Sequence, residues 1–184
     1  MLCFTLSGCG ILKQLESAYN FTECKYTYNS ITKLSISGID VTNGISLLSV
    51  PKILSILSGQ ETSIPLNFNL NLDVANPNTS AAIMNGLEYI LSIDGIQFTT
   101  GSINQSVNIP AGGQQVLPLN IGLDLKTLLT GATGDAALSI VKNFIGLGDQ
   151  QSNIKLQIKP TFTVSGYAIP SPAYIPVSFS FGGK

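Results

Sequence analysis

A strict alternation of apolar and polar residues marks the stretch from Leu66 to Val74. Large apolar side chains stand at positions 66, 68, 70, 72 and 74, and polar ones stand at 67, 69, 71 and 73. A period of two over nine residues predicts a strand with one face in a core and the other in water. The strand should stop before Asn76-Pro77-Asn78, because Pro77 fixes its own φ and has no N–H for a ladder. We predict a turn there, with the Asn side chains satisfying the freed backbone groups.

Further alternating stretches predict an all-β fold. A second strand carries Tyr89, Leu91 and Ile93 on one face, and Asp94-Gly95 after it is typical of a two-residue hairpin turn. In residues 31–41 the alternation changes phase at Gly38, which predicts a bulge or a bend. Similar stretches lie at residues 107–109, 117–123, 154–164 and 175–181. About seven strands separated by turn residues every 8–12 positions predict a single β-sandwich.

Two stretches predict helical insertions in this sandwich, near residues 50–58 and 125–146. The first has Pro51 in its first turn and Gly59 at its end, and Asp124 is placed to cap the second. The first insertion carries four apolar residues: Ile53, Leu54, Ile56 and Leu57. They either cover one end of the sandwich or form an interaction surface for a membrane or a partner protein.

The first residues resemble the end of a lipoprotein signal peptide. Leu6-Ser7-Gly8-Cys9 has the apolar and small residues of a bacterial lipobox, with Cys9 as the residue that receives lipid. The apolar stretch before it is shorter than a complete signal peptide, which indicates a translation start upstream of Met1. The alternative is that Cys9 is an incidental residue. We therefore assign residues 1–9 to a signal-peptide remnant, 10–30 to a tether and 31–182 to the sandwich domain.

The lipobox has consequences for location and for the other cysteines. Gly10 is not acidic, which favours the outer over the inner membrane of a cell envelope. Cys24 is then the remaining thiol of the mature chain, and a structural role is favoured over a reactive one because no His or Arg is present to lower its pKa. A disulfide between Cys9 and Cys24 requires that the lipobox assignment be wrong.

Composition removes several classes of function. The chain has no His in 184 residues, so the commonest general base and the commonest transition-metal ligand are missing. Its nine basic residues are all Lys and its net charge is −1, so we expect no nucleic-acid partner. The carboxylates are scattered, and we predict no catalytic residues, no metal and no cofactor. The polar face Asn67, Asn69, Asn71 and Asp73 is interpreted as solvated, with a sugar or cation site as the alternative.

An ordered set of motifs resembles the water-stress-and-hypersensitive-response (WHy) domain of the type 2 late-embryogenesis-abundant family. The set is the Asn76-Pro77-Asn78 turn after an alternating strand, the Tyr-x-Leu-x-Ile strand at 89–93, Asp94-Gly95, Ile109-Pro110-Ala111-Gly112-Gly113, and Leu117-Pro118-Leu119. The resemblance covers residues 31–124, and the last two strands fit more loosely. It implies an immunoglobulin- or fibronectin-III-like sandwich, a link to desiccation and stress tolerance, and no established catalytic residues.

These expectations combine into one functional hypothesis. The chain is expected to be a non-enzymatic, lipid-anchored protein of the cell envelope that binds or shields envelope components during water stress. The alternative is a subunit or adaptor of an envelope protein assembly that uses the apolar residues of 50–58 or a sheet edge. The sequence leaves the ligand, the partner and the oligomeric state open.

Overall fold

Strand β3 (Pro65–Ala75) is an inner strand of its four-stranded sheet and has the half-buried character that the alternation of its residues predicted. The structure is a computed structural model in which residues 8–183 are described. The side chains of Leu66, Phe68, Leu70, Leu72 and Val74 are buried, while those between them face solvent wholly or in part. At roughly 1.5–3 kcal/mol for each large apolar side chain, this one strand contributes on the order of 10 kcal/mol of burial before conformational entropy is subtracted.

Two antiparallel sheets and a small ribbon contain all the strands of residues 8–183. The first sheet has the order β2-β1-β3-β8, and the second has the order β10-β9-β5-β6 with β11 also paired to β9. The strands of the first sheet besides β3 are β1 (Lys25–Ile36), β2 (Ile39–Asp40) and β8 (Gln114–Asp124). Those of the second are β5 (Gly86–Ile93), β6 (Ile96–Ile103), β9 (Ser152–Val164), β10 (Tyr167–Pro170) and β11 (Ile175–Phe181). The ribbon pairs β4 (Ala82–Met84) with β7 (Val107–Ile109).

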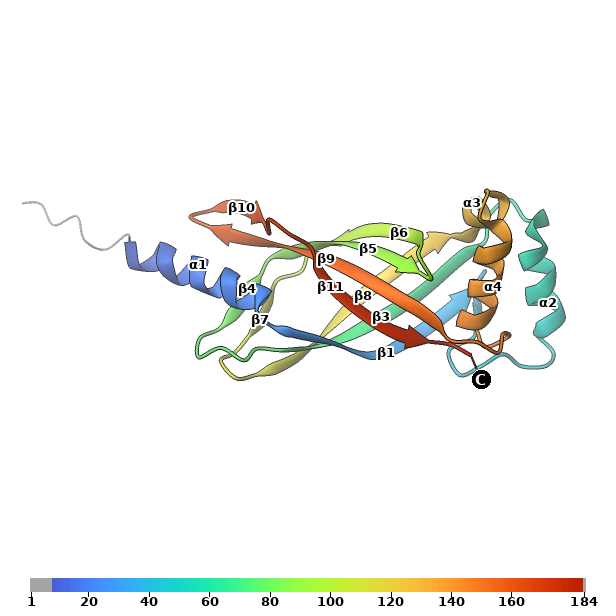
Figure 1. Cartoon of the computed structure of the whole chain (residues 1–184), viewed down its shortest axis with the longest axis horizontal. Coiled ribbons are helices and arrows are strands. Elements are labelled where there is room, and N and C mark those ends of the chain that lie inside the picture. The colour runs from blue at the N-terminus through green and yellow to red at the C-terminus, as the bar shows by residue number, and fades with distance from the viewer. Residues whose placement is uncertain (1–7, 184) are drawn as a thin grey trace, which may run out of the picture.

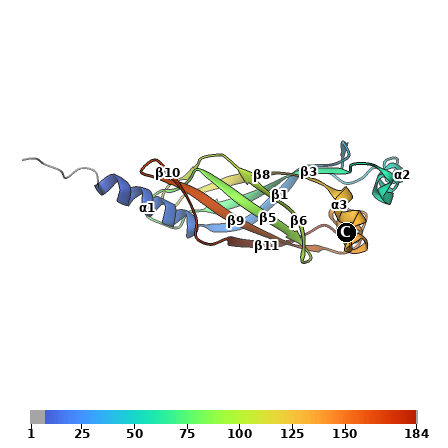
Figure 2. The same cartoon turned by 90° about the horizontal axis from the view of Figure 1, so that it is seen from above.

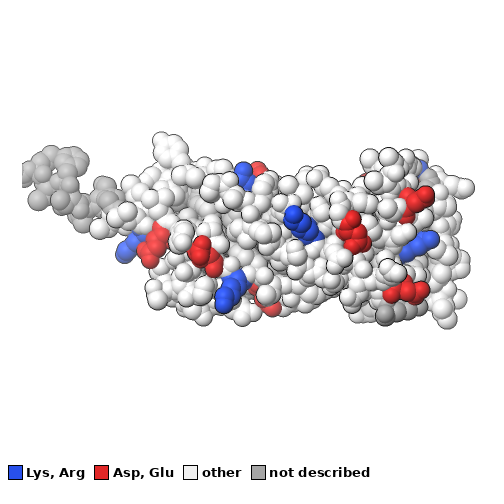
Figure 3. Space-filling view, viewed as in Figure 1, with Lys and Arg blue, Asp and Glu red and all other residues white. Residues whose placement is uncertain are grey.

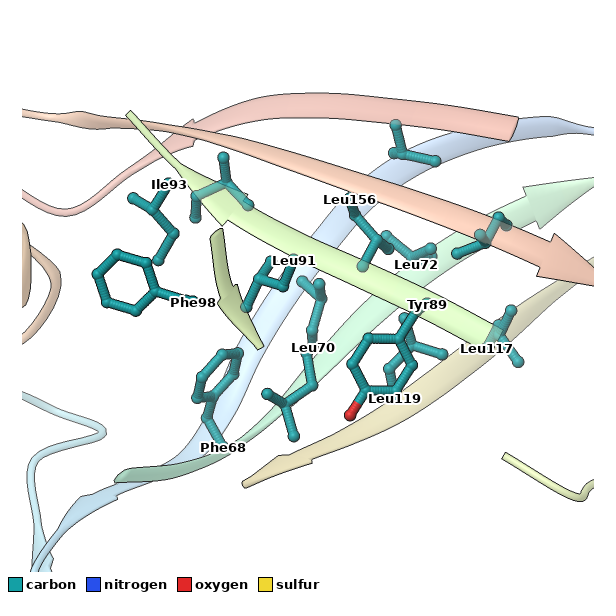
Figure 4. Close-up of a cluster of buried hydrophobic side chains, with 14 of the residues drawn as sticks. Phe68, Leu70, Leu72, Tyr89, Leu91, Ile93, Phe98, Leu117, Leu119 and Leu156 are labelled. Carbon is teal, nitrogen blue, oxygen red and sulfur yellow. The ribbon is translucent and has the colours of Figure 1, made fainter. Parts of the chain in front are cut away.

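The two sheets pack face to face along most of the molecule (Figure 1). Figure 4 shows Phe68, Leu70 and Leu72 of β3 among residues that come from β5, β6, β8 and β9. Phe98, Leu119 and Leu156 are examples from three of these strands, and all three are buried. Because each sheet buries only one face of its central strands, the core is a single apolar layer between the sheets.

Two prolines within strands occupy positions that need no N–H donor. Pro118 lies on β8, which is the edge of the first sheet. Pro160 lies in β9 between the part that pairs with β11, Ser152–Ile158, and the part that pairs with β10, Thr161–Val164. The missing donor of Pro160 therefore falls where β9 changes partner on that side.

Hairpin turns of two residues join neighbouring strands where left-handed backbone is required. Asp94 and Gly95 have φ of 47° and 82°, which confirms the predicted turn between β5 and β6. Ser37 and Gly38 have φ of 46° and 78° and turn the chain from β1 into β2. The phase change at Gly38 is thus a hairpin turn rather than a bulge.

Helices lie at both ends of the elongated molecule (Figures 1 and 2). One end carries α2 (Val50–Ser55), a π-helical turn η1 (Ile56–Gln60), α3 (Leu125–Thr130) and α4 (Gly134–Phe144), as the two predicted insertions require. The rings of Phe68 and Phe144 lie 5.1 Å apart between centroids, which fixes α4 against β3. The opposite end carries α1 (Gly8–Thr22).

The fold differs from the sequence expectation in two respects. Residues 10–30 were expected to form a tether, but they form most of α1 and the first six residues of β1. Phe21 explains the difference, because its ring is completely buried and packs edge-on against Tyr26 and Phe162. The mostly-β class is confirmed, but residues 8–183 contain eleven strands, several of them short, rather than about seven.

The carboxylate of Asp124 should make stability depend on pH. It accepts hydrogen bonds from the backbone N–H of Ile64 (2.8 Å), the hydroxyl of Ser63 (2.7 Å) and the backbone N–H of Lys126 (2.9 Å), which lower the pKa of Asp124 below its ordinary value. Because the folded pKa lies below the unfolded one, the stabilisation is present above the unfolded pKa and is lost as pH falls through the folded pKa. We therefore expect Asp124→Ala to lower the urea midpoint at neutral pH, and we expect the difference from wild type to vanish in acid.

The measurement is urea unfolding followed by circular dichroism between pH 7 and pH 2. Asp149→Ala is the matched control, since Asp149 is exposed and accepts no side-chain hydrogen bond among residues 8–183. A wild-type midpoint at pH 7 in Asp124→Ala would contradict this role.

Candidate functional site: the asparagine corner and the N-terminal helix

The turn after β3 is built around the buried amide of Asn76, which is only 2% exposed. Its side-chain nitrogen donates to the carbonyl oxygens of Ser80 (2.9 Å), Ile109 (3.1 Å) and Pro110 (3.0 Å). Its side-chain oxygen accepts from the backbone N–H of Asn78 at 3.0 Å and from the amide of Asn78 at 2.9 Å. Both ends of this amide are satisfied within the protein, so Asn76 joins three chain segments and has no free group for a ligand.

The second asparagine of the turn carries the network on to α1. The amide of Asn78 also donates to the backbone carbonyl of Asn20 at 3.2 Å. The buried amide of Asn20 in turn donates to the hydroxyl of Ser80 at 2.7 Å and to the carbonyl of Ala81 at 3.3 Å. We call Asn20, Asn76, Asn78 and Ser80 the asparagine corner. It fixes the last turns of α1 to the end of the first sheet.

Two further contacts hold the earlier turns of α1. The hydroxyl of Ser80 donates to the carboxylate of Glu16 at 2.6 Å, and the side-chain oxygen of Gln14 accepts from the backbone N–H of Ser165 at 2.9 Å. Between α1 and the segment that enters β4 lies a groove of about 330 Å³. Its lining residues are Lys13, Gln14, Glu16, Ser17, Ser80, Ala81 and Ile83. The one Lys and the one Glu balance, so this groove has no net charge to select a charged ligand.

The two cysteines of the described residues have opposite environments. Cys9 is exposed in the first turn of α1, whereas Cys24 is buried, and both are free thiols. Burial raises the pKa of Cys24 to about 11, and its Sγ donates to the carbonyl of Asn20 at 3.3 Å. A protonated, hydrogen-bonded and buried thiol is unreactive, so Cys24 is a structural part of the α1 junction.

The predicted interaction surface of the first helical insertion needs correction. Ile53, Ile56 and Leu57 are buried and only Leu54 is exposed. These side chains cover the end of the sandwich, which was the other interpretation of the same residues. The exposed apolar residues at this end are instead Leu47 and Leu48, which are 90% and 94% exposed, together with Leu54. Little in the sequence indicated these exposed leucines, because the loop before α2 has no regular periodicity.

Two of the four residues on the polar face of β3, Asn71 and Asp73, are hydrogen-bonded to its neighbour β1. The amide of Asn71 donates to the hydroxyls of Ser30 (3.0 Å) and Thr32 (3.3 Å), and the amide of Asn29 donates to the carboxylate of Asp73 at 3.1 Å. Within residues 8–183 no three His, Cys, Asp or Glu side chains gather in a way that could hold a metal ion. Among the helices of the same residues, none has both the length and the apolar character needed to cross a membrane.

Two features of this site were absent from the sequence prediction. Asn20 is a partner of the Asn76-Pro77-Asn78 turn from 58 residues away along the chain, and α1 is a formed helix rather than a tether. The available signal was the apolar set Ile11, Leu15 and Ala18, which recurs at helical spacing. Nothing in the sequence links Asn20 to Asn78, because that contact depends on the packing of α1.

Comparison with known proteins gave one family match and several similar folds. A family model described as "Late embryogenesis abundant protein" matches residues 71–172, more than half of the chain. The comparison with curated proteins gave no match.

Three solved structures illustrate the fold similarity. A protein from Archaeoglobus fulgidus has a TM-score of 0.41 at 14% identity, and the match covers 86% of this chain and 98% of that one. At2g46140.1, ascribed to the late embryogenesis abundant (LEA) proteins, has a TM-score of 0.39 at 16% identity over 92% and 83% of the two chains. AT1g01470 from Arabidopsis thaliana has a TM-score of 0.38 at 12% identity over 86% and 77%.

Removal of the Asn76 amide should destabilise the whole domain. Asn76→Ala removes a hydrogen bond from the carbonyls of Ser80, Ile109 and Pro110 and from the N–H of Asn78. The carbonyls of Ser80 and Pro110 keep a second donor, the amide of Asn20 and the N–H of Gly113, whereas the other two groups lose the side-chain partner that the corner gives them. We expect a loss of about 2–4 kcal/mol in the free energy of unfolding, since each buried polar group left unsatisfied costs about 1–3 kcal/mol. Urea unfolding measures it, with Asn120→Ala as the control because Asn120 is exposed on β8. Equal stability of the two variants would contradict the role of the corner.

Proposed function

Because the chain belongs to the late embryogenesis abundant protein family, we propose that it is a non-enzymatic, lipid-anchored protein of the cell envelope with a stress-protective role. It binds or shields envelope proteins or membranes when water is scarce. The observation that carries the proposal is the position of Cys9, exposed on the first turn of a helix that the asparagine corner fixes to the domain. A lipid on Cys9 would therefore hold a folded domain at the membrane.

The lipid attachment rests on the lipobox Leu6-Ser7-Gly8-Cys9 and on the accessibility of Cys9. Residues 1–7, most of the predicted signal-peptide remnant 1–9, lie outside the described residues. A lipoprotein carries more than one acyl chain, and each buried methylene adds about 0.8 kcal/mol, so attachment would be stable. Gly10 favours the outer membrane.

The finer fold assignment is a WHy-type sandwich of the immunoglobulin or fibronectin-III class. It is supported by two antiparallel sheets packed face to face and by the place of the Asn76-Pro77-Asn78 turn between β3 and β4. In this assignment the triplet is a structural motif, since its buried polar groups are all used within the corner. Catalytic residues, cofactors, metals and nucleic acid have no part in the proposed function.

The alternative function is that of a subunit or adaptor in an envelope assembly. It is favoured by Leu47, Leu48 and Leu54, three exposed leucines at the end of the molecule opposite to α1. Two adjacent leucines that are each at least nine-tenths exposed cost solubility unless a partner covers them.

Replacement of Cys9 tests the lipid anchor. We expect the wild-type protein, expressed from its complete gene, to enter the detergent phase on phase separation, and we expect Cys9→Ser to stay in the aqueous phase. Mass spectrometry of the N-terminal peptide should show the acyl chains on wild type alone. Cys24→Ser is the matched control and should retain the lipid, because Cys24 is buried. Identical partitioning of wild type and Cys9→Ser would remove the anchor from the proposal.

A second experiment separates shielding from the adaptor function. Shielding predicts that the purified protein preserves the activity of lactate dehydrogenase through drying, better than an equal mass of albumin, and that Leu48→Asp preserves it equally. The adaptor function predicts that a defined envelope protein co-purifies with wild type and is lost from Leu48→Asp. Since Leu48 is exposed, thermal unfolding of the variant should match that of wild type and exclude a folding defect.

A further inference from the structure

Helix α1 turns an apolar face away from the protein. The exposed apolar residues of this helix are Ile11, Leu12, Leu15 and Tyr19, and among them Leu12 is 66% and Tyr19 is 63% exposed. The buried residues of the helix are Ala18, Asn20 and Phe21, and the exposed Gln14 and Glu16 also hydrogen-bond to the body of the protein. A surface helix normally buries its apolar stripe, so this arrangement is the reverse of the usual one.

The spacing of these residues places them on one stripe. At about 100° per residue, positions 11, 12, 15 and 19 fall within an arc of about 100°. The polar residues Lys13, Glu16 and Ser17, which line the groove on the domain side, fall outside this arc. The exposed stripe therefore runs along a little more than two turns of the helix and is left uncovered by the rest of residues 8–183.

A second exposed apolar group lies at the same end of the molecule. The β9–β10 turn donates from the N–H of Ser165 to Gln14, which places the start of β10 against α1. On β10, Tyr167 is 75% exposed and Ile169 is also exposed. Figures 1 and 2 show α1 and β10 together at the end of the molecule that carries Cys9.

We propose that the stripe Ile11, Leu12, Leu15 and Tyr19, with the tip of β10, lies in the interfacial region of a lipid bilayer and sets the orientation of the domain on the membrane. This inference rests on the proposed lipid anchor, which would bring the acyl chains to within one turn of Ile11 and Leu12. A short helix with one apolar and one polar side binds a membrane by lying in the plane of the interface with its apolar side toward the acyl chains. The two tyrosines suit this position, because a phenol ring is apolar in its body and polar at its tip.

The charged residues at this end give the proposed surface no preference for anionic over neutral lipid. Lys13 and Glu16 lie on α1, with Glu23 and Lys25 just after it, so positive and negative side chains balance. On the face shown in Figure 3, basic and acidic side chains are interspersed along the molecule and form no cluster of one sign. Binding should accordingly depend on apolar contact, with little effect of salt or of anionic lipid. The long axis would then point away from the membrane and would present Leu47 and Leu48 at the far end.

The absence of Trp from the chain permits a direct test with single-tryptophan variants. Tyr19→Trp and Tyr167→Trp report on the proposed surface, and Leu48→Trp reports on the opposite end. Each acylated, full-length variant is reconstituted into phosphatidylcholine vesicles with and without brominated acyl chains. We expect the emission of Tyr19→Trp and Tyr167→Trp to shift to shorter wavelength and to be quenched by the brominated lipid, while Leu48→Trp keeps a water-exposed spectrum.

The outcomes separate the orientation from the anchor. If acylated protein enters the vesicles but Tyr19→Trp and Tyr167→Trp stay unquenched, the orientation is overturned and the anchor stands. If the chain is not acylated, the same variants are titrated with vesicles as free protein: quenching by brominated lipid then supports the surface without the anchor, and its absence overturns the surface. A spectral shift that depends on protein concentration without vesicles would mean that a second copy covers the stripe, which overturns the bilayer assignment.

A charge placed on the stripe provides a further control. In the Cys9→Ser background, Leu12→Asp should reduce vesicle binding of the free protein, whereas Leu48→Asp should leave it unchanged. Both residues are exposed, so thermal unfolding should be the same for the two variants and for their parent. Equal vesicle binding by the two variants would overturn the proposed surface.

Discussion

The structure depends on one buried amide at the corner where β3 ends. Asn76 joins the end of the central strand, the loop after β7 and the segment before β4, and through Asn78 this network reaches α1. An amide has both a donor group and an acceptor, so it can satisfy backbone groups of both kinds in a place that water cannot reach. An aspartate there would bring a buried charge without the N–H donors, and a leucine would remove a hydrogen bond from each of four backbone groups. The constraint explains why asparagine occupies this position between a buried strand and a proline.

The corner also makes the two ends of the molecule different from each other. The apolar core between the two sheets does not distinguish one end of the molecule from the other. Helix α1 and the exposed Cys9, in contrast, are fixed to one end only. The opposite end is closed by the buried residues of α2, α3 and α4, with the exposed leucines of the preceding loop beyond them. In the proposed function, the domain acts through its surfaces and its orientation. The proposed lipid anchor, the stripe on α1 and the leucines of the opposite end follow one another along the long axis of the molecule.

Particular residues show where prediction from the sequence succeeded and where it failed. The Asp94-Gly95 turn, the Asp124 cap and the central strand were predicted because each depends on local chemistry or on a period of two. The tether assigned to residues 10–30 was wrong, because the helix there is held by contacts of Phe21 and Asn20 with distant strands. The burial of Ile53, Ile56 and Leu57 was open for the same reason, since an apolar stretch at a chain surface and one at the end of a core have the same composition.

By itself, the sequence determined the mostly-β class, the main turns, the helical insertions and the place of the Asn-Pro-Asn corner. These features follow from side-chain periodicity and backbone preference, which act within a few residues of one another. Only the tertiary structure decided that Asn20 completes the corner, that Cys24 is enclosed, and that the apolar side of α1 faces outward. Each of these depends on which distant segments come into contact, and that is set by the packing of two sheets and a helix rather than by any local pattern.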